Sequence, residues 1–99
     1  MASILVVDDE LSMREFLTIL LEKEGYGVRA AADGKSALAL LEAQPFDLVI
    51  SDIRMPGMTG LELLARSKQL RPETGVIMIT AFASPADAVT AMKNGAVDD

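Results

Sequence analysis

The chain has 99 residues, of which 51% are hydrophobic and 24% are charged, so its composition is that of one globular domain and excludes a disordered segment. It contains no cysteine and no histidine, which excludes a disulfide framework, thiolate metal sites and histidine-based acid–base catalysis. A formal net charge of -6 argues against direct nucleic acid binding by this domain, because contacts with phosphate groups need a basic face.

The chain opens on a continuous apolar run at residues 3–7, which ends at Asp8 and Asp9 and is typical of a strand buried on both faces. Because charged residues follow the run at once, we predict no signal peptide. We also predict no membrane partner, because no uncharged run is long enough to span a bilayer. Ser12 and Glu15 fit a capping box, so the next helix is predicted to begin at Ser12 and to end at Gly25. Its apolar residues recur at helical spacing: Met13, Phe16, Leu17, Leu20 and Leu21. We expect Met13, Met78 and Met92 to lie in the core.

Strands and helices alternate along the rest of the chain. Helix starts are marked by an N-cap or a capping box, and helix ends by glycine or proline. The predicted elements are a weak strand at 28–31, a helix from Asp33–Gly34 to just before Pro45, a strand at 46–51 ending at Asp52, a helix from the Thr59–Glu62 capping box to about Leu70, a strand at 76–79 ending at Thr80, and a helix from Ser84–Pro85 to about Asn94. Helical crossovers between short apolar strands imply an α/β fold with a doubly wound parallel sheet.

Three carboxylates, those of Asp8, Asp9 and Asp52, follow two of the predicted strands. Open parallel sheets bind ligands beyond the carboxyl ends of their strands. Two carboxylates about 5 Å apart repel each other by roughly 3 kcal/mol at an effective dielectric constant near 20, so three together favour a bound cation. An all-oxygen ligand set points to Mg²⁺ or a similar hard ion. Any one of these aspartates alone is as readily explained as a turn former or a helix cap.

Three segments resemble, in the right order, the successive motifs of response-regulator receiver domains of two-component signalling. They are residues 5–10 (Leu-Val-Val-Asp-Asp-Glu), residues 47–60, which contain the Asp-Ile-Arg-Met-Pro-Gly-Met-Thr-Gly stretch, and residues 77–81 (Ile-Met-Ile-Thr-Ala). The resemblance covers the whole chain and implies a flavodoxin-like sheet of strand order 2-1-3-4-5. It also implies a cytoplasmic phosphoprotein that acts as a signalling domain and not as an enzyme.

The resemblance assigns a role to each motif residue. Asp52 is similar to the phosphoacceptor, which takes a phosphoryl group from a sensor histidine kinase. Thr80 is similar to the switch hydroxyl that bonds the new phosphate, and Ala81 to the small residue that leaves the aspartate accessible. The Mg²⁺ ligands implied are Asp8, Asp9, Asp52 and the backbone carbonyl of Arg54. Further implied partners are an output domain or partner protein and a second copy of the chain. The amino-acid sequence at residues 54–58 and 78–82 resembles that of receivers attached to enhancer-binding transcription activators.

This sequence departs from the family pattern at its C-terminus. The family has a phosphate-pairing lysine a few residues beyond this terminus and usually an aromatic residue at the position of Asp99. We therefore expect residues 1–99 to be a receiver domain that lacks its fifth strand and fifth helix. The strand at 76–79 is then expected to be an exposed edge, and the fragment to be marginally stable by itself unless another chain covers that edge.

Three other functions compete with this interpretation. A pseudo-receiver would be a protein-interaction module that accepts no phosphate, and the missing lysine is its support. A phosphatase of the haloacid dehalogenase type would need a second aspartate where this chain has Arg54. A nucleotide or flavin binder on the same fold would need a glycine-rich loop after the first strand, and none is present.

Overall fold

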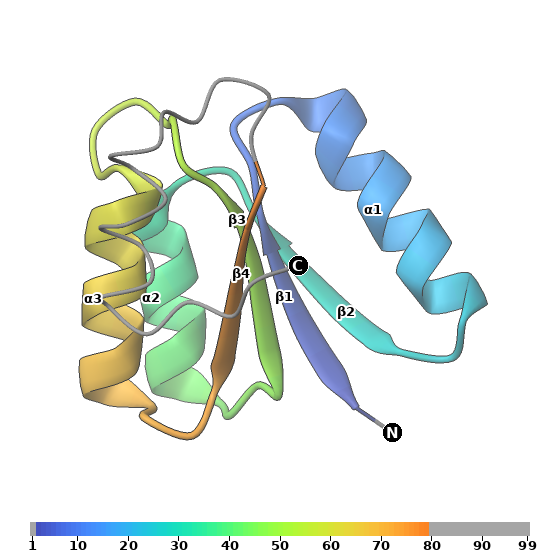
Figure 1. The fold of residues 1–99 in the computed structure, drawn as a ribbon. Coiled ribbons are helices and arrows are strands. Elements are labelled where there is room, and N and C mark those ends of the chain that lie inside the picture. Colours follow the sequence, from blue (N-terminus) through green and yellow to red (C-terminus); the bar gives the residue numbers. More distant parts are fainter. Residues whose placement is uncertain (1, 80–99) are drawn as a thin grey trace.

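The computed structural model describes residues 2–79, which fold into alternating strands and helices (Figure 1). The elements are β1 (Ser3–Val7), α1 (Leu11–Lys23), β2 (Gly27–Ala31), α2 (Gly34–Ala43), β3 (Leu48–Asp52), α3 (Gly60–Leu70) and β4 (Gly75–Ile79). The predicted alternation is confirmed over this range. Thr80, Ala81, Met92 and the helix predicted from Ser84–Pro85 lie outside the described residues.

The sheet is fully parallel in the described range, with strand order β2-β1-β3-β4. This order is the one predicted for the first four strands of a flavodoxin-like fold. At the amino edge of the sheet, β1 and β3 are clasped together. The Ser3 amide donates to Oδ2 of Asp47 at 2.7 Å, and the Asp47 amide donates to the Ser3 carbonyl at 2.9 Å. The two central strands therefore start in a fixed register.

Helices cover both faces of the sheet, with α1 on one side and α2 and α3 on the other (Figure 1). Successive residues of β1 point to opposite faces, as a pleated strand requires. Leu5 and Val7 join the larger core with α2 and α3, while Ile4 and Val6 join the smaller core under α1. The main core buries large aliphatic side chains completely, among them Leu41, Leu63 and Leu64.

Two of the predicted helix starts are confirmed. Asp33 caps α2, because its carboxylate accepts a hydrogen bond from the Ser36 amide at 2.7 Å. Thr59 and Glu62 form the predicted capping box at the start of α3, where the Thr59 hydroxyl accepts from the Glu62 amide at 3.2 Å and the Glu62 carboxylate accepts from the Thr59 amide. Both caps satisfy backbone donors that would otherwise lack partners within the helix.

The predicted capping box of α1 is wrong. The helix begins at Leu11 after Glu10, no side chain caps it, and Ser12 lies exposed inside its first turn. The physical reason lies one turn earlier, where the Asp8 carboxylate accepts a hydrogen bond from the Glu10 amide at 2.9 Å. This bond already closes the turn out of β1, so the helix starts before Ser12 can act as its cap.

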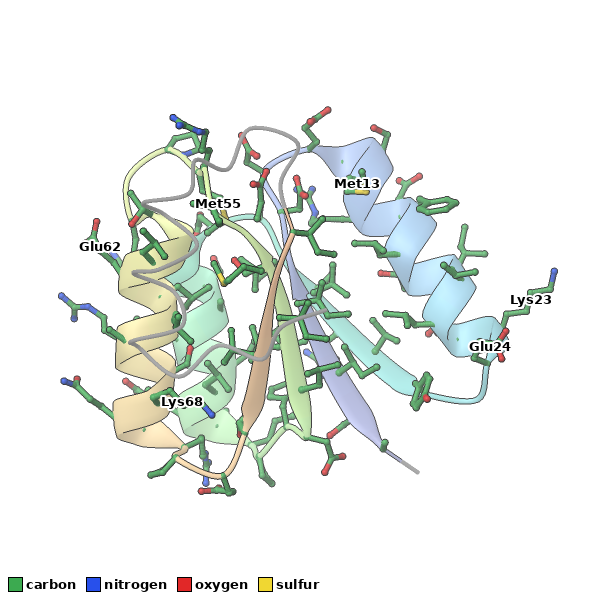
Figure 2. The ribbon with its side chains drawn as sticks, viewed as in Figure 1. Met13, Lys23, Glu24, Met55, Glu62 and Lys68 are labelled. Carbon is green, nitrogen blue, oxygen red and sulfur yellow. The ribbon has the colours of Figure 1, made fainter. Side chains whose placement is uncertain are left out.

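The expected core position of Met13 is also wrong, since this side chain is 39% exposed and Phe16 beside it is 60% exposed. Among the apolar residues of α1, Leu17 and Leu21 pack against the sheet and are only partly buried. Figure 2 shows Met13 on α1 and Met55 on the opposite side of the sheet, near the start of α3. Met78 packs against the main core and is partly buried. Of the helices described, none has the length and apolar character needed to cross a bilayer.

Candidate functional site

The strand register brings the predicted carboxylates together at one edge of the sheet. Val7 of β1 pairs with Ser51 of β3, so the next residues along these neighbouring parallel strands are Asp8 and Asp52. One carboxylate oxygen each from Asp8, Asp9 and Asp52 lies within 4.8 Å of the others. The predicted convergence of three acidic side chains is therefore present in the structure.

Three hydrogen bonds fix the position of Asp8 in the turn after β1. Its amide donates to the Ala31 carbonyl at 3.2 Å, and its Oδ1 accepts from the Glu10 amide at 2.9 Å. The Arg14 guanidinium donates to the Asp8 backbone carbonyl at 2.7 Å. Asp8 is buried, with 8% of its surface exposed, whereas Asp9 is exposed to solvent.

The turn after β3 repeats part of this arrangement. Oδ1 of Asp52 accepts a hydrogen bond from the Arg54 amide at 3.1 Å, which fixes the rotation of the carboxylate and leaves Oδ2 available. The Gly60 amide donates to the Ile53 carbonyl at 2.8 Å, so residues 53–59 form a loop that is closed at its base. We call residues 53–59 the acceptor loop.

The electrostatics of the cluster fit a bound cation. Burial raises the pKa of Asp8 above its ordinary value, and the nearby charges of Asp52 and Asp9 raise it further. The Glu10 amide and Arg14 act in the opposite direction without cancelling this effect. Carboxylate and carbonyl oxygens are the donors that hard divalent ions such as Mg²⁺ prefer, so the residues present suit that ion.

Sequence reasoning did not find every residue that shapes this site. Arg14 was not singled out, although a cation in the first turn of the helix after an acidic strand end is a signal that could have found it. Two methionines of the acceptor loop pack behind the site, because Met55 is buried in the main core and Met58 packs against it. The roles of Thr80 and Ala81 stay predictions, since both residues lie outside the described range.

A parallel sheet with an acidic cluster beyond its central strands is the arrangement of a signalling receiver domain, and the sequence comparison agrees. Residues 4–99 match the response regulator receiver domain family. The chain therefore belongs to this family.

Bacterial regulators are among the relatives of this chain. The chain is 44% identical over 94 residues to the response regulator protein PilR of Pseudomonas aeruginosa, covering 95% of this chain and 21% of PilR. It is 44% identical over 95 residues to the transcriptional regulatory protein ZraR of Escherichia coli, covering 96% of this chain and 22% of ZraR. The chain thus spans about a fifth of the length of these two relatives.

Among solved structures, a response regulator protein from Burkholderia pseudomallei superimposes on this chain with a TM-score of 0.94. The two are 35% identical, and the match covers 99% of this chain and 58% of the other. That structure contains a phosphorylated aspartic acid, a calcium ion and citrate.

Proposed function

We propose that this domain is a phosphorylation-dependent switch that accepts a phosphoryl group on Asp52 from a sensor histidine kinase in the presence of Mg²⁺. The observation that carries the proposal is the gathering of Asp8, Asp9 and Asp52 oxygens within 4.8 Å at the carboxyl edge of the sheet. Aspartates that served only as turn formers would not need to share one site. The phosphorylated aspartic acid and calcium ion in the Burkholderia relative support this proposal.

The chemistry requires one free carboxylate oxygen and a means of balancing charge. With Oδ1 of Asp52 held by the Arg54 amide, Oδ2 is the oxygen that attacks phosphorus, and the histidine nitrogen of the kinase departs as phosphorus–nitrogen bonding is lost. Asp8, Asp9, Asp52 and the Arg54 backbone carbonyl would hold Mg²⁺ at this site. When bound, Mg²⁺ supplies positive charge that neutralises the transferring group.

Phosphorylation adds about -1.5 to -2 charges to a cluster that already holds three carboxylates. In the proposed switch, the Thr80 hydroxyl bonds the new phosphate, and the small side chain of Ala81 leaves room for it. The two charge states then favour different conformations, and this difference is what an output domain or partner protein reads. The transcriptional regulatory proteins among the relatives support an output in transcription control. A cytoplasmic location and a homodimeric active state are further parts of the proposal.

The test is phosphorylation by a small phosphodonor such as acetyl phosphate with Mg²⁺, read by intact mass. The full chain should gain one phosphoryl group, and Asp52→Asn should gain none. Asp47→Asn is the matched control, because Asp47 lies at the opposite edge of the sheet in the clasp with Ser3. Labelling that persists in Asp52→Asn would refute the assignment. A chain that binds Mg²⁺ and takes no phosphate would favour the pseudo-receiver.

A further inference from the structure

Gly34, the first residue of α2, forms a slot for the side chain of Met58 from the acceptor loop. A Cβ atom added at Gly34 would lie 2.7 Å from Sδ, 2.9 Å from Cβ and 3.0 Å from Cγ of Met58. Gly34 is buried, and Met58 is partly buried against the main core. The Met58 side chain from Cβ to Sδ therefore fills the space that a side chain at residue 34 would need.

Neither helix geometry nor backbone strain explains a glycine at this position. Positive φ angles occur in the described residues only at Gly25 and Gly57, so the backbone of Gly34 is open to any residue. Alanine is also the better helix former. What glycine supplies here is space. The Sδ atom of Met58 could swing away from an added methyl group, but its Cβ is attached to the backbone and could move only with the acceptor loop.

The base of the acceptor loop is also held by close contact with a glycine. A Cβ atom at Gly60 would collide with the Asp52 carbonyl oxygen and would lie 2.7 Å from Cα of Ile53. Close backbone approach and the hydrogen bond from the Gly60 amide to the Ile53 carbonyl hold the base of the loop. Arg54, whose amide orients the Asp52 carboxylate, lies between this base and Met58.

We propose that Gly34 and Met58 are positioning residues for the site, and that their contact sets the shape of the acceptor loop and through it the orientation of the Asp52 carboxylate and the Arg54 backbone. Met58 and Gly34 touch none of the reacting atoms in this proposal. It rests on the proposed function, since the orientation matters only if this site binds Mg²⁺ and accepts phosphate.

A double-mutant cycle in the full chain tests the contact. Gly34→Ala should weaken Mg²⁺ binding roughly tenfold, which is the size of effect usual for residues that orient metal ligands. Met58→Ala removes the anchor without adding atoms and should cause a smaller loss. Alanine keeps the Met58 Cβ that an added Cβ at Gly34 would meet at 2.9 Å, so the second background is Met58→Gly, which removes all three of these atoms. In the Met58→Gly background Gly34→Ala should cause no further loss. Mg²⁺ affinity is read from NMR titrations that also follow the amide shifts of residues 53–60.

Gly25→Ala is the matched control for lost stability. Gly25 has φ +95 and no neighbouring atom within 4 Å of an added Cβ, so alanine there strains the backbone at the opposite edge of the sheet. It should lower stability and leave Mg²⁺ affinity unchanged. The proposal is overturned if Gly34→Ala weakens Mg²⁺ binding by the same factor in both backgrounds, or if Gly25→Ala weakens it as much.

Two further readouts keep the result decisive. If Gly34→Ala does not fold, Met58→Ala alone must still weaken Mg²⁺ binding, and unchanged binding overturns the proposal. If the unmodified chain binds no Mg²⁺, the proposed function fails, but the metal-free amide shifts still test the contact. Gly34→Ala must move the Arg54 and Gly60 amide signals when Met58 is present, and must not move them in the Met58→Gly background. Unmoved signals overturn it.

Discussion

The two helices that follow the acidic strands are held in very different ways. Helix α3 buries four of its residues and starts with a complete capping box, whereas α1 buries none and has no side-chain cap. Yet the turns that lead into both helices share one hydrogen bond, in which an aspartate oxygen accepts the amide two residues ahead: Glu10 to Asp8, and Arg54 to Asp52. The site is therefore built by strand ends and tight turns, and it does not need equal packing behind its two halves.

The difference between α1 and α3 predicts that substitutions in the β1–α1 unit and in the β3–α3 unit will have different effects. The unit of β3 and α3 combines core packing with a shaped loop, so changes there should affect stability first. The unit of β1 and α1 carries Asp8 and Asp9 in the turn before α1, a helix with no buried residue. Changes in this turn should therefore act mainly through charge and the metal ion.

Matched truncations of one leucine in each helix should show the largest difference. Leu64 of α3 is completely buried, so Leu64→Ala should cost about 3 kcal/mol of unfolding free energy through lost burial and a cavity. Leu20 of α1 is 44% exposed, and Leu20→Ala should cost less than about 1 kcal/mol. Urea denaturation measures both. Equal losses would show that α1 is anchored as firmly as α3.

The ion should stabilise the protein through the turn after β1. At tenfold excess over its dissociation constant, Mg²⁺ should add about 1.4 kcal/mol to the unfolding free energy. Asp9→Ala should lose most of this gain and should raise metal-free stability by relieving carboxylate repulsion. Glu10→Ala, which removes a neighbouring acid outside the cluster, should respond to Mg²⁺ as the unmodified chain does. Thermal melts with and without Mg²⁺ decide this, and an unchanged response in Asp9→Ala would remove Asp9 from the site.

The helix caps should differ as well. Thr59→Ala removes one partner of the capping box of α3 and should cost about 1 kcal/mol. Ser12→Ala lies in the uncapped first turn of α1 and should change stability by less than about 0.5 kcal/mol. Denaturation midpoints of the two variants measure the difference. A larger effect at Ser12 would restore the capping box that the sequence predicted there.

The smallest expected effect is a pH dependence of opposite sign at two aspartates. Burial, with the charges of Asp52 and Asp9, raises the pKa of Asp8 above its ordinary value of 3.8, against the opposing effects of the Glu10 amide and Arg14. The folded state therefore holds the Asp8 proton more tightly than the unfolded state. In the absence of metal, the Asp8 contribution to stability should improve as the pH falls through the raised pKa and level off below 3.8.

Asp33 should behave in the opposite way. Hydrogen bonds from Ser36 lower the pKa of Asp33, so its stabilising contribution is full above 3.8 and is lost as the pH falls through the lowered value. Without Mg²⁺, Asp8→Asn should be more stable than the unmodified chain at neutral pH, and Asp33→Asn less stable. Both differences should shrink on acidification. A difference for Asp8→Asn that grows on acidification would contradict the burial of its charge.

The sequence predicted most of the fold because the deciding signals are local. Apolar runs ended by aspartate predicted β1 and β3, and the Asp33 and Thr59 caps predicted the starts of α2 and α3. The convergence of Asp8, Asp9 and Asp52 followed from the parallel order of the strands. The start of α1 was mistaken because the Asp8 side chain takes a turn bond that no periodic pattern reveals. Helical spacing likewise showed that α1 has apolar residues without showing how little of that surface the sheet covers.

The contacts that the sequence could not reveal join segments far apart in the chain. No local pattern pairs Gly34 at the start of α2 with Met58, which lies in a loop after another strand. The hydrogen bond from Arg14 to the Asp8 carbonyl depends on where α1 begins, and that boundary was misplaced. Thr80 and Ala81 stay predictions from the resemblance alone.

The clasp between Ser3 and Asp47 has a consequence for how this protein would tolerate change. Sliding β1 by one residue against β3 would move Asp8 by about 3.3 Å along the strand direction and turn every side chain of β1 to the other face. The register that the Ser3–Asp47 hydrogen bonds set at the amino edge therefore fixes the spacing of the Asp8 and Asp52 carboxylates at the opposite edge. An insertion within β1 or β3 would destroy the ion site even if the sheet still formed, whereas an insertion at the exposed tip of the acceptor loop would leave this spacing intact.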